Sequence, residues 1–326
     1  MTTYKGIKGL SIQTVAGDPS NLAAGDIWYD SVARKVQGAK LSAAAWASSN
    51  NVNTARTFHD GAGTQTAGLI FAGRPPESTL GTLAETYDGS SWTEVADLST
   101  QRGYVGGCGS QTAAICVGGF DGTVSAPNVR AQVENWNGSG WTEVGDLNAA
   151  RYDVSVFGTS TAAIGAGGDP YPGASTNVEI WNGSSWTETT ELNTGRGEGA
   201  KGAAGTVSTA GLVFGGPPNV VEVWNGSAWT ESAEQNTAKQ GNCGFGSSTA
   251  ALSAGGSAGG NQAIVEEWDG SSWTEVADLN TARGFAAGDG TTSAAFIAAG
   301  GPGSSKSNAT EEWTGQTIEA VTFTSS

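Results

Sequence analysis

The chain has 326 residues, of which 51 are Gly and 12 are Trp, and only 14% are charged. This composition favours short strands joined by tight turns, and no long segment repeats its apolar residues with a helical period. A formal net charge of −16 disfavours nucleic-acid binding, because an acidic surface repels phosphate groups. No apolar run is long enough to predict membrane insertion, and the N-terminus lacks the apolar stretch of a signal peptide. We therefore expect an all-β protein without a nucleic-acid partner.

Residues 1–41 form a first segment outside any repeat. "GDIWYDS" at 25–31 predicts a short strand, "VARK" a turn, and "VQGAKL" at 36–41 a returning strand. This β-hairpin resembles a short segment common in tail-fibre and other virion proteins of tailed bacteriophages, where it lies near the attachment end. The resemblance implies a protein that is assembled in the host cytoplasm and located in the virion. Residues 1–41 would then attach the chain to other virion proteins or form a homo-oligomer.

Residues 42–326 contain an internal repeat. The tryptophan that opens phrases such as "WTEVADL" recurs every 43 to 49 residues, at Trp92, Trp141, Trp186, Trp229 and Trp273. Each unit reads as four short strands, for example "YVGGCG", "AAICVGG", "AQVENW" and "WTEVGDL" within 104–147. Four strands per period of this length are the signature of a β-propeller blade. The order Arg, Gly-Gly, Glu-x-aromatic, Trp resembles a kelch repeat, which implies a six-bladed propeller with four antiparallel strands per blade.

An Asp-Gly or Asn-Gly dipeptide lies between two aromatic residues in most units, as in "WNGSGW" at 136–141. Such a dipeptide predicts a β-hairpin with a type I′ turn, and a loop of either two or four residues leaves both aromatics on one face. Large flat side chains on that face would fill the space between blades. The predicted stacking residues are Tyr87, Trp92, Trp136, Trp141, Trp181, Trp186, Trp224, Trp229, Trp268, Trp273 and Trp313.

A glutamate lies two residues before the first aromatic of each pair, on the same face. A buried carboxylate is costly unless it is paired, and one cation recurs in each unit. We expect structural ion pairs within or between blades. The glutamates are Glu85, Glu134, Glu179, Glu222, Glu266 and Glu311, and the cations are Arg56, Arg102, Arg151, Arg196, Lys239 and Arg283.

The Gly-Gly pairs, at 118–119, 167–168, 215–216, 255–256 and 300–301, end the second strand of a unit. They predict a close backbone approach or a positive φ, and the absence of GxxxxGK[ST] argues against a phosphate loop. Two segments fit the register of the outermost strand of the last blade, "QTIEAVTF" near the C-terminus and "WASSNNV" from residue 46. Because the last unit carries its own candidate strand, we expect the C-terminal segment to close the ring.

No catalytic or cofactor motif is evident. "DGSSW" differs from the Asp box of sialidases because glycine follows the aspartate at once. A single histidine, His59, and three cysteines, Cys108, Cys116 and Cys243, have no metal-ligand spacing. Most acidic residues recur at equivalent positions, whereas a catalytic residue should break the repeat. We expect neither enzyme activity nor a cofactor, although calcium binding by a loop stays open.

The loops after each Gly-Gly vary most between units, and variable loops on a fixed scaffold are where recognition concentrates. The candidate recognition residues are Asp121, Asn128, Asp169, Tyr171, Asn219 and Asn261. The leading interpretation is a tail-associated or surface virion protein whose propeller recognises a host glycan or protein, or decorates the particle. The alternatives are an intracellular kelch-type interaction module and a carbohydrate-active propeller enzyme.

Overall fold

The computed structural model describes residues 12–76, 80–122, 128–197, 199–216, 219–301 and 306–323, and every regular element in them is a strand. Accordingly, these residues contain no helix that could cross a membrane. The chain divides into two compact units, residues 45–314 and residues 1–44 together with 315–326. We expected residues 42–326 to form one propeller domain, but the C-terminal segment groups with the N-terminal one.

The described part of residues 45–314 contains six four-stranded antiparallel sheets, which we number as blades 1 to 6. Blade 1 comprises β5 (Asp60–Thr64), β6 (Ala67–Phe71), β7 (Ala84–Tyr87) and β8 (Trp92–Glu94). Blade 2 comprises β9 (Gly106–Ser110), β10 (Ala113–Val117), β11 (Val133–Trp136) and β12 (Trp141–Glu143). Blade 3 comprises β13 (Ser155–Thr159), β14 (Ala162–Ala166), β15 (Val178–Trp181) and β16 (Trp186–Glu188).

Blade 4 comprises β17 (Gly202–Val207), β18 (Ala210–Phe214), β19 (Val221–Trp224) and β20 (Trp229–Ser232). Blade 5 comprises β21 (Cys243–Ser247), β22 (Ala250–Ala254), β23 (Val265–Trp268) and β24 (Trp273–Glu275). Blade 6 comprises β25 (Ala287–Gly290), β26 (Ala294–Ala298), β27 (Thr310–Thr314) and β4 (Ala45–Ser49).

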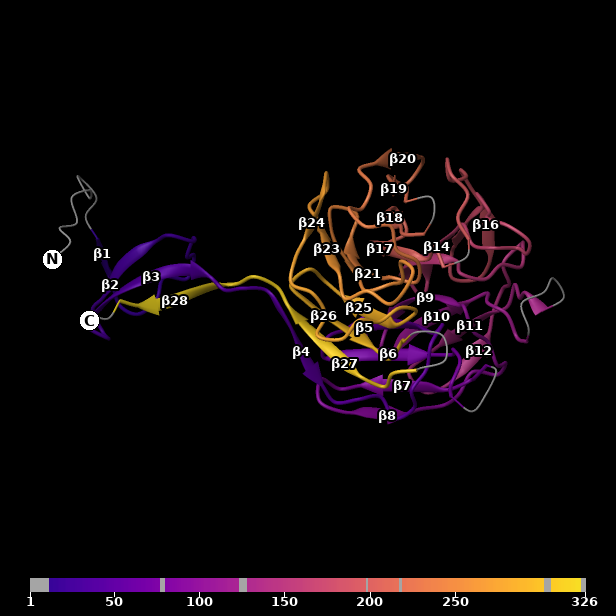
Figure 1. Cartoon of the computed structure of the whole chain (residues 1–326), viewed down its shortest axis with the longest axis horizontal. Coiled ribbons are helices and arrows are strands. Elements are labelled where there is room, and N and C mark those ends of the chain that lie inside the picture. The colour runs from indigo at the N-terminus through magenta and orange to yellow at the C-terminus, as the bar shows by residue number, and fades with distance from the viewer. Residues whose placement is uncertain are drawn as a thin grey trace. The chain divides into compact units, whose positions relative to one another are not determined.

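The first strand of each blade lies at the centre and the fourth at the rim (Figure 1). Each inner strand lies beside the inner strand of the next blade, and β25 of blade 6 lies beside β5 of blade 1. The last sheet therefore neighbours the first, as in a propeller. The predicted all-β propeller with four antiparallel strands per blade is confirmed.

The outer strand of blade 6 comes from the N-terminal side of the propeller. β4 pairs antiparallel with β27, and Trp46 lies opposite Trp313, as the two aromatics do in the other blades. The C-terminal segment instead forms β28 (Ile318–Thr322), which pairs with β3 (Lys35–Leu41) in the other unit. The predicted C-terminal closure is therefore wrong. Trp46 supplies the aromatic partner that Trp313 needs, whereas Ile318 has no aromatic ring.

The hairpin between the third and fourth strands has a four-residue loop. In blade 2 Trp136 lies directly opposite Trp141, and the carboxamide oxygen of Asn137 accepts hydrogen bonds from the main-chain N–H groups of Ser139 and Gly140, at 2.9 and 3.0 Å. Gly138 has a φ of +91°, but Asn137 stays at negative φ. The predicted type I′ turn is therefore wrong, because the Asx side chain closes the turn and one glycine suffices.

The paired aromatics fill the space between blades. Ring centroids within a pair lie 4.8 Å apart for Tyr87 and Trp92 and 5.4 Å apart for Trp136 and Trp141. A phenylalanine of one blade also contacts the pair of the next, as Phe296 of blade 6 contacts Trp92 of blade 1 at 5.9 Å. Most of these rings are almost fully buried, whereas Trp141 is partly exposed. Aromatic packing of this kind stabilises the stack through buried area and edge-to-face contacts.

Five of the six predicted ion pairs form, each within one blade. The pairs Arg56–Glu85, Arg102–Glu134, Arg151–Glu179, Lys239–Glu266 and Arg283–Glu311 have almost no side-chain exposure. The prediction is wrong for blade 4, where Arg196 donates to the main-chain carbonyls of Gly215 and Val220. Glu222 there accepts main-chain and side-chain hydrogen bonds from Asn193 and a main-chain bond from Thr194.

The same glutamates also hold the connection that arrives from the preceding blade. Asn148, between blades 2 and 3, donates its main-chain N–H to Glu179 at 2.8 Å. Its side-chain amide donates to Glu179 and to the carbonyl of Trp186 in blade 3. The repeated "LNTAR" phrase is therefore a strap that fixes each blade to the next.

The Gly-Gly pairs have positive φ, for example +60° at Gly118 and +97° at Gly119. The second glycine donates to the carbonyl of the cation that begins the next blade, as Gly119 does to Arg151 at 2.9 Å. In blade 6 this donor is Gly300, bonded to the Arg56 carbonyl at 2.8 Å. The pair there is thus Ala299–Gly300, one residue earlier than the sequence motif suggested.

The second unit contains β1 (Gln13–Val15), β2 (Ile27–Asp30), β3 and β28 in one sheet. The predicted hairpin of β2 and β3 is confirmed, and β1 adds a parallel strand. Asp30 stabilises its turn by accepting main-chain hydrogen bonds from Gly17, Val32 and Ala33. These bonds lower the pKa of Asp30, the one from Ala33 having the largest effect.

Candidate functional site

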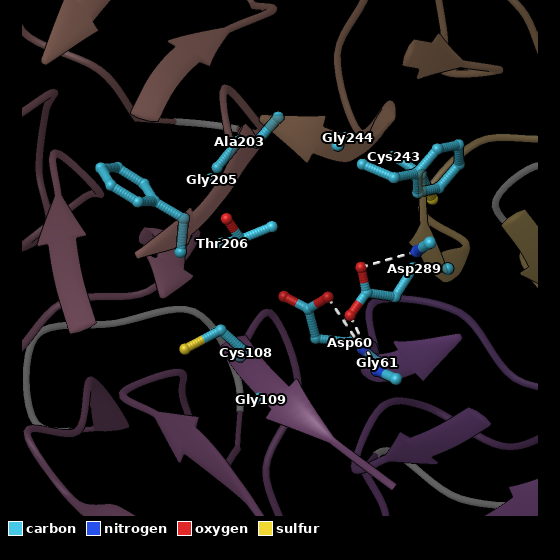
Figure 2. Close-up of a pocket in the computed structure, with 18 of the residues that line it drawn as sticks. Asp60, Gly61, Cys108, Gly109, Ala203, Gly205, Thr206, Cys243, Gly244 and Asp289 are labelled. Atoms are coloured by element: carbon cyan, nitrogen blue, oxygen red, sulfur yellow. Dashed lines mark hydrogen bonds between the residues drawn. The ribbon is translucent and has the colours of Figure 1, made fainter. Parts of the chain in front are cut away.

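The inner strands of all six blades line a cavity of about 560 Å³ in the middle of the propeller. Its lining extends from Asp60 and Lys201 to the hairpin tips between the first and second strands, such as Thr64–Thr66. A cavity of this volume lies in the range of small-molecule sites, which are commonly concave and formed by the scaffold itself. The centre of the ring is therefore the candidate functional site (Figure 2).

A ring of interblade hydrogen bonds bounds the cavity where the inner strands begin. Phe58 donates its main-chain N–H to Phe285, Tyr104 to Phe58, and Asp153 to Tyr104, at 2.7 to 3.0 Å. Phe285 donates to Gly241, which in turn donates to Gly199, both at 2.7 Å. The sixth bond is different, because Gly199 donates to the carboxylate of Asp153 at 2.7 Å.

Aromatic rings cover this bounded end. Phe58 stacks on Tyr104 with centroids 3.8 Å apart and contacts Phe285 at 4.6 Å. The Phe285 ring lies so close to Gly241 that a β-carbon there would meet it at 2.4 Å. The cavity therefore has a floor formed by backbone and aromatic rings, and it opens between the hairpin tips at the other end.

Two aspartates present carboxylates to the cavity. Asp60, at the start of β5, accepts the main-chain N–H of Gly61 at 2.8 Å and lies 3.7 Å from Lys201 Nζ. Asp289, on β25, accepts the main-chain N–H groups of Gly63 and Gly290, each at 2.7 Å (Figure 2). Burial raises the pKa of both carboxyls, that of Asp289 to about 7, with a contribution from the Asp60 charge. Asp289 thus changes its charge near neutral pH.

Lys201 is the one cation among the described residues that line the cavity. Its ammonium donates to the main-chain carbonyls of His59 at 2.9 Å and Val105 at 3.4 Å, which fixes it beside Asp60. His59 itself is buried behind the wall, and its pKa is well below the usual range because of burial and the nearby cations. His59 is therefore neutral, with Nε2 3.2 Å from the Ala298 carbonyl.

The floor contains a third carboxylate. Asp153 is 1% exposed, has a positive φ of 51°, and uses one oxygen to complete the hydrogen-bond ring. Burial raises its pKa to about 7. Its side chain replaces the main-chain carbonyl that serves in the other blades, so Asp153 has a structural role.

Two cysteines, Cys108 and Cys243, also line the cavity. Burial raises the pKa of both thiols, that of Cys243 to about 12, so both are protonated at neutral pH. A protonated thiol is a weak nucleophile and a weak metal ligand. No cluster of three or more His, Cys, Asp or Glu side chains that could hold a metal is found among the described residues.

Sequence reasoning missed these residues, although it had the necessary signal. The inner strands end alike, in "GT" or "GS", at residues 63–64, 109–110, 158–159, 205–206, 246–247 and 290–291. Counting back from this landmark, the position of Asp60 holds Gly, Ser, Cys or Ala in the other blades, and the position of Asp289 holds Ala, Cys or Phe. Both aspartates break the repeat, which is the property expected of a functional residue.

The predicted recognition residues lie apart from the cavity, in loops at the end of the propeller where the inner strands begin. Asp169 is 1% exposed and accepts hydrogen bonds from the Tyr152 hydroxyl and the Tyr171 main chain, so its assignment to recognition is wrong. Asp121 pairs with Arg130, and its main-chain N–H donates to the Asn128 carbonyl.

The remaining predicted recognition residues differ in exposure and in bonding. Asn219 and Asn261 donate to the carbonyls of Gln235 and Ala282, in the strap that follows each loop. Tyr171 is 41% exposed and is the one large apolar side chain that this group offers to solvent. Among the six, Tyr171 is therefore the clearest candidate for contact with another molecule.

Comparison with known proteins supports the fold. No family model matches the chain, and no curated protein matches it. Among solved structures, 433 chains are similar. One is that of YjhT, with a TM-score of 0.65 and 12% sequence identity over 83% of this chain and 99% of that one. At this identity the likeness shows a shared fold and nothing about activity.

Proposed function

We propose that this protein is a structural virion protein of a tailed bacteriophage, attached through its small terminal unit, with a propeller that recognises the host surface. The observation that carries the proposal is the distribution of exposed apolar side chains. Six of the eight described large apolar residues that are exposed lie in the small unit: Ile12, Ile27, Val32, Leu41, Ile318 and Phe323. Only Tyr171 and Val207 are exposed in the propeller.

Exposed apolar groups concentrated on a small sheet are typical of an interaction surface. β2 and β3 carry the segment that resembles virion proteins, and β1 and β28 are the two edge strands of their sheet among the described residues. Edge strands and apolar groups suit assembly with another protein or with further copies of the chain. The chain enters the propeller at Ala45 and leaves it at Thr314, and these two residues lie opposite each other on the paired strands β4 and β27.

The propeller has the properties of a displayed module. Straps and interblade aromatic contacts brace its blades against one another, and buried ion pairs stabilise each blade. The loops after the Gly-Gly positions differ in length and composition. Such an arrangement allows loops to change without loss of the scaffold. A host glycan or surface protein is the proposed partner of these loops, with Tyr171 as a contact residue.

Incorporation into particles tests the attachment. Phage particles produced with the unaltered gene should contain the protein, as measured by quantitative mass spectrometry after density-gradient purification. Ile27→Asp should remove it from particles, because a charge on the apolar surface opposes docking. Val207→Asp is the matched control, since Val207 is 47% exposed in the propeller and Ile27 is 44% exposed. Absence of the unaltered protein from particles would favour the intracellular interaction module.

Recognition is tested separately with fluorescently labelled full-length protein and host cells. Cell labelling should be saturable and should weaken in Tyr171→Ala but not in Val207→Ala. Labelling that is lost after glycan-removing treatment of the cells would identify a glycan receptor, and loss after protease treatment would identify a protein. Particles that carry the protein without any cell labelling would reduce its role to particle decoration.

A further inference from the structure

The described lining of the cavity presents two carboxyl groups and one cation. The carboxyl groups are those of Asp60 and Asp289, and the cation is Lys201. Lys201 lies beside Asp60, whereas the hydrogen bonds of Asp289 come from two main-chain N–H groups. A carboxylate in a low-dielectric cavity gains most from a cation that reaches it directly.

One primary ammonium group already lies in the cavity wall. The primary ammonium of Lys201 is held by two main-chain carbonyls beside Asp60, at the end of an alkyl chain that is itself buried. A second primary ammonium directed at Asp289 would repeat this recognition with the other carboxylate. Three N–H donors on a compact charge suit a site that offers carboxylate oxygens.

The walls suit an alkyl chain. Val156, Phe157, Ala203 and Phe245 line the cavity together with glycines of the inner strands. Apolar walls around a few polar groups are typical of ligand sites in which the walls bind the carbon skeleton and the polar groups fix its orientation. An extended aliphatic chain that enters between the hairpin tips would first meet Asp289, near the end of β25, and then Asp60, at the start of β5.

We propose that the central cavity binds a primary alkylammonium group, with the ammonium seated against the carboxylates of Asp289 and Asp60 and the alkyl chain against the apolar walls. The group belongs either to a small aliphatic amine or to a lysine side chain of another protein. This inference goes beyond the proposed attachment to a virion, and the site and the terminal unit are tested by different measurements.

The test is isothermal titration calorimetry of the purified full-length protein with butane-1,4-diamine, and with butane-1,4-diol as the uncharged analogue of equal length. The diamine should bind and the diol should not, and binding should weaken as salt is added because charge attraction drives it. Equal binding of both compounds, or no binding of the diamine, would overturn the proposal.

Proton linkage provides evidence that needs no variant. Because the pKa of Asp289 is raised to about 7, an ammonium that binds beside it should displace its proton when the pH is below that value. Titrations at pH 6 in two buffers of different ionisation enthalpy should therefore show proton release, and titrations at pH 8.5 should show much less. Diamine binding that is independent of pH would place the ligand elsewhere.

Variants then locate the site. Asp289→Asn should weaken diamine binding at least about tenfold, which corresponds to about 1.4 kcal/mol. Glu143→Gln removes an exposed carboxylate on β12, the outer strand of blade 2, which does not line the cavity, and should leave affinity unchanged. If Asp289→Asn fails to fold, the proton release of the unaltered protein decides. Unchanged affinity in a folded Asp289→Asn variant would refute the site.

The two sources of the ammonium are separated by a second ligand series. A short peptide with one central lysine is compared with the same peptide in which that lysine is acetylated, which removes the charge. Tighter binding of the lysine peptide than of the diamine would identify a protein partner. Binding of the diamine alone would identify a small amine. In both cases the ammonium group occupies the same position in the central cavity.

Discussion

Replacing Glu134 with alanine should strongly destabilise the propeller. Glu134 accepts Arg102 Nη2 at 2.7 Å and the main-chain N–H of Ser99 at 2.8 Å, and the Arg102 side chain has no exposed surface. The substitution leaves a buried guanidinium without its counter-charge, which typically costs about 3 to 5 kcal/mol. Since whole proteins are stable by only about 5 to 15 kcal/mol, this loss is a large fraction of the total.

Urea unfolding followed by tryptophan fluorescence measures the effect. With a denaturant dependence of about 3 kcal/mol per M, the midpoint should fall by roughly 1 to 1.7 M. Glu143→Ala is the matched control, because Glu143 lies opposite Glu134 on the next strand but is exposed. The control should change stability by no more than about 0.5 kcal/mol.

A double variant separates charge from packing. Arg102→Met with Glu134→Leu removes both charges and keeps apolar volume, and it should recover part of the stability lost in Glu134→Ala. If the free energies of unfolding of Glu134→Ala and of the Glu143→Ala control differ by less than about 1 kcal/mol, the buried ion pair does not stabilise the blade and the prediction is refuted.

Three further predictions follow from the fold. Deleting residues 315–326 should leave the thermal unfolding of the propeller unchanged. Deleting residues 1–49 should abolish folding, because β4 completes blade 6. The reverse result would mean that the C-terminal segment closes the ring. Trp186→Ala should lower the free energy of unfolding in urea by about 3 to 5 kcal/mol, because the ring is 5% exposed. Thr187→Ala should lower it little, because Thr187 is exposed. Equal losses in the two variants would contradict interblade stacking. Burial raises the folded-state pKa of Asp289 to about 7, so its contribution to stability is fully present below its unfolded pKa near 4 and is lost as the pH rises through 7. The free energy of unfolding of Asp289→Asn should therefore depend less on pH between 4 and 7 than that of the unaltered chain. Parallel pH profiles of the two proteins would contradict the shift.

Much of the propeller was predictable because its determinants are local and repeated. Strand length, turn residues and alternation are set within a few residues, and a period of about 45 residues is diagnostic of blades. The pairing of Arg102 with Glu134 was predicted because each unit has one glutamate on the aromatic face and one recurring cation. Arg196 departs from this rule, because its Nη2 donates to the Val220 carbonyl, whereas the Nη2 of Arg102 donates to Glu134.

The candidate site was harder to predict because it depends on contacts across the ring. Asp60 and Asp289 are 229 positions apart in the sequence, and only closure of blade 6 against blade 1 brings Asp289 to the main chain of Gly63. The raised pKa of Asp289 likewise depends on burial by strands from other blades. The break in the repeat marked both residues, but the repeat alone could not reveal that they face one cavity.

The sequence by itself determined the all-β class, the number of blades, the aromatic pairs and the hairpin of the small unit, since each depends on short-range pattern. The tertiary structure decided which terminus closes the ring, which loops bury their polar residues, and where carboxylates meet. β4 and β28 have similar local signals, so their choice of partner depends on the aromatic neighbour available to Trp313. Such choices depend on packing between distant segments, which local pattern does not encode.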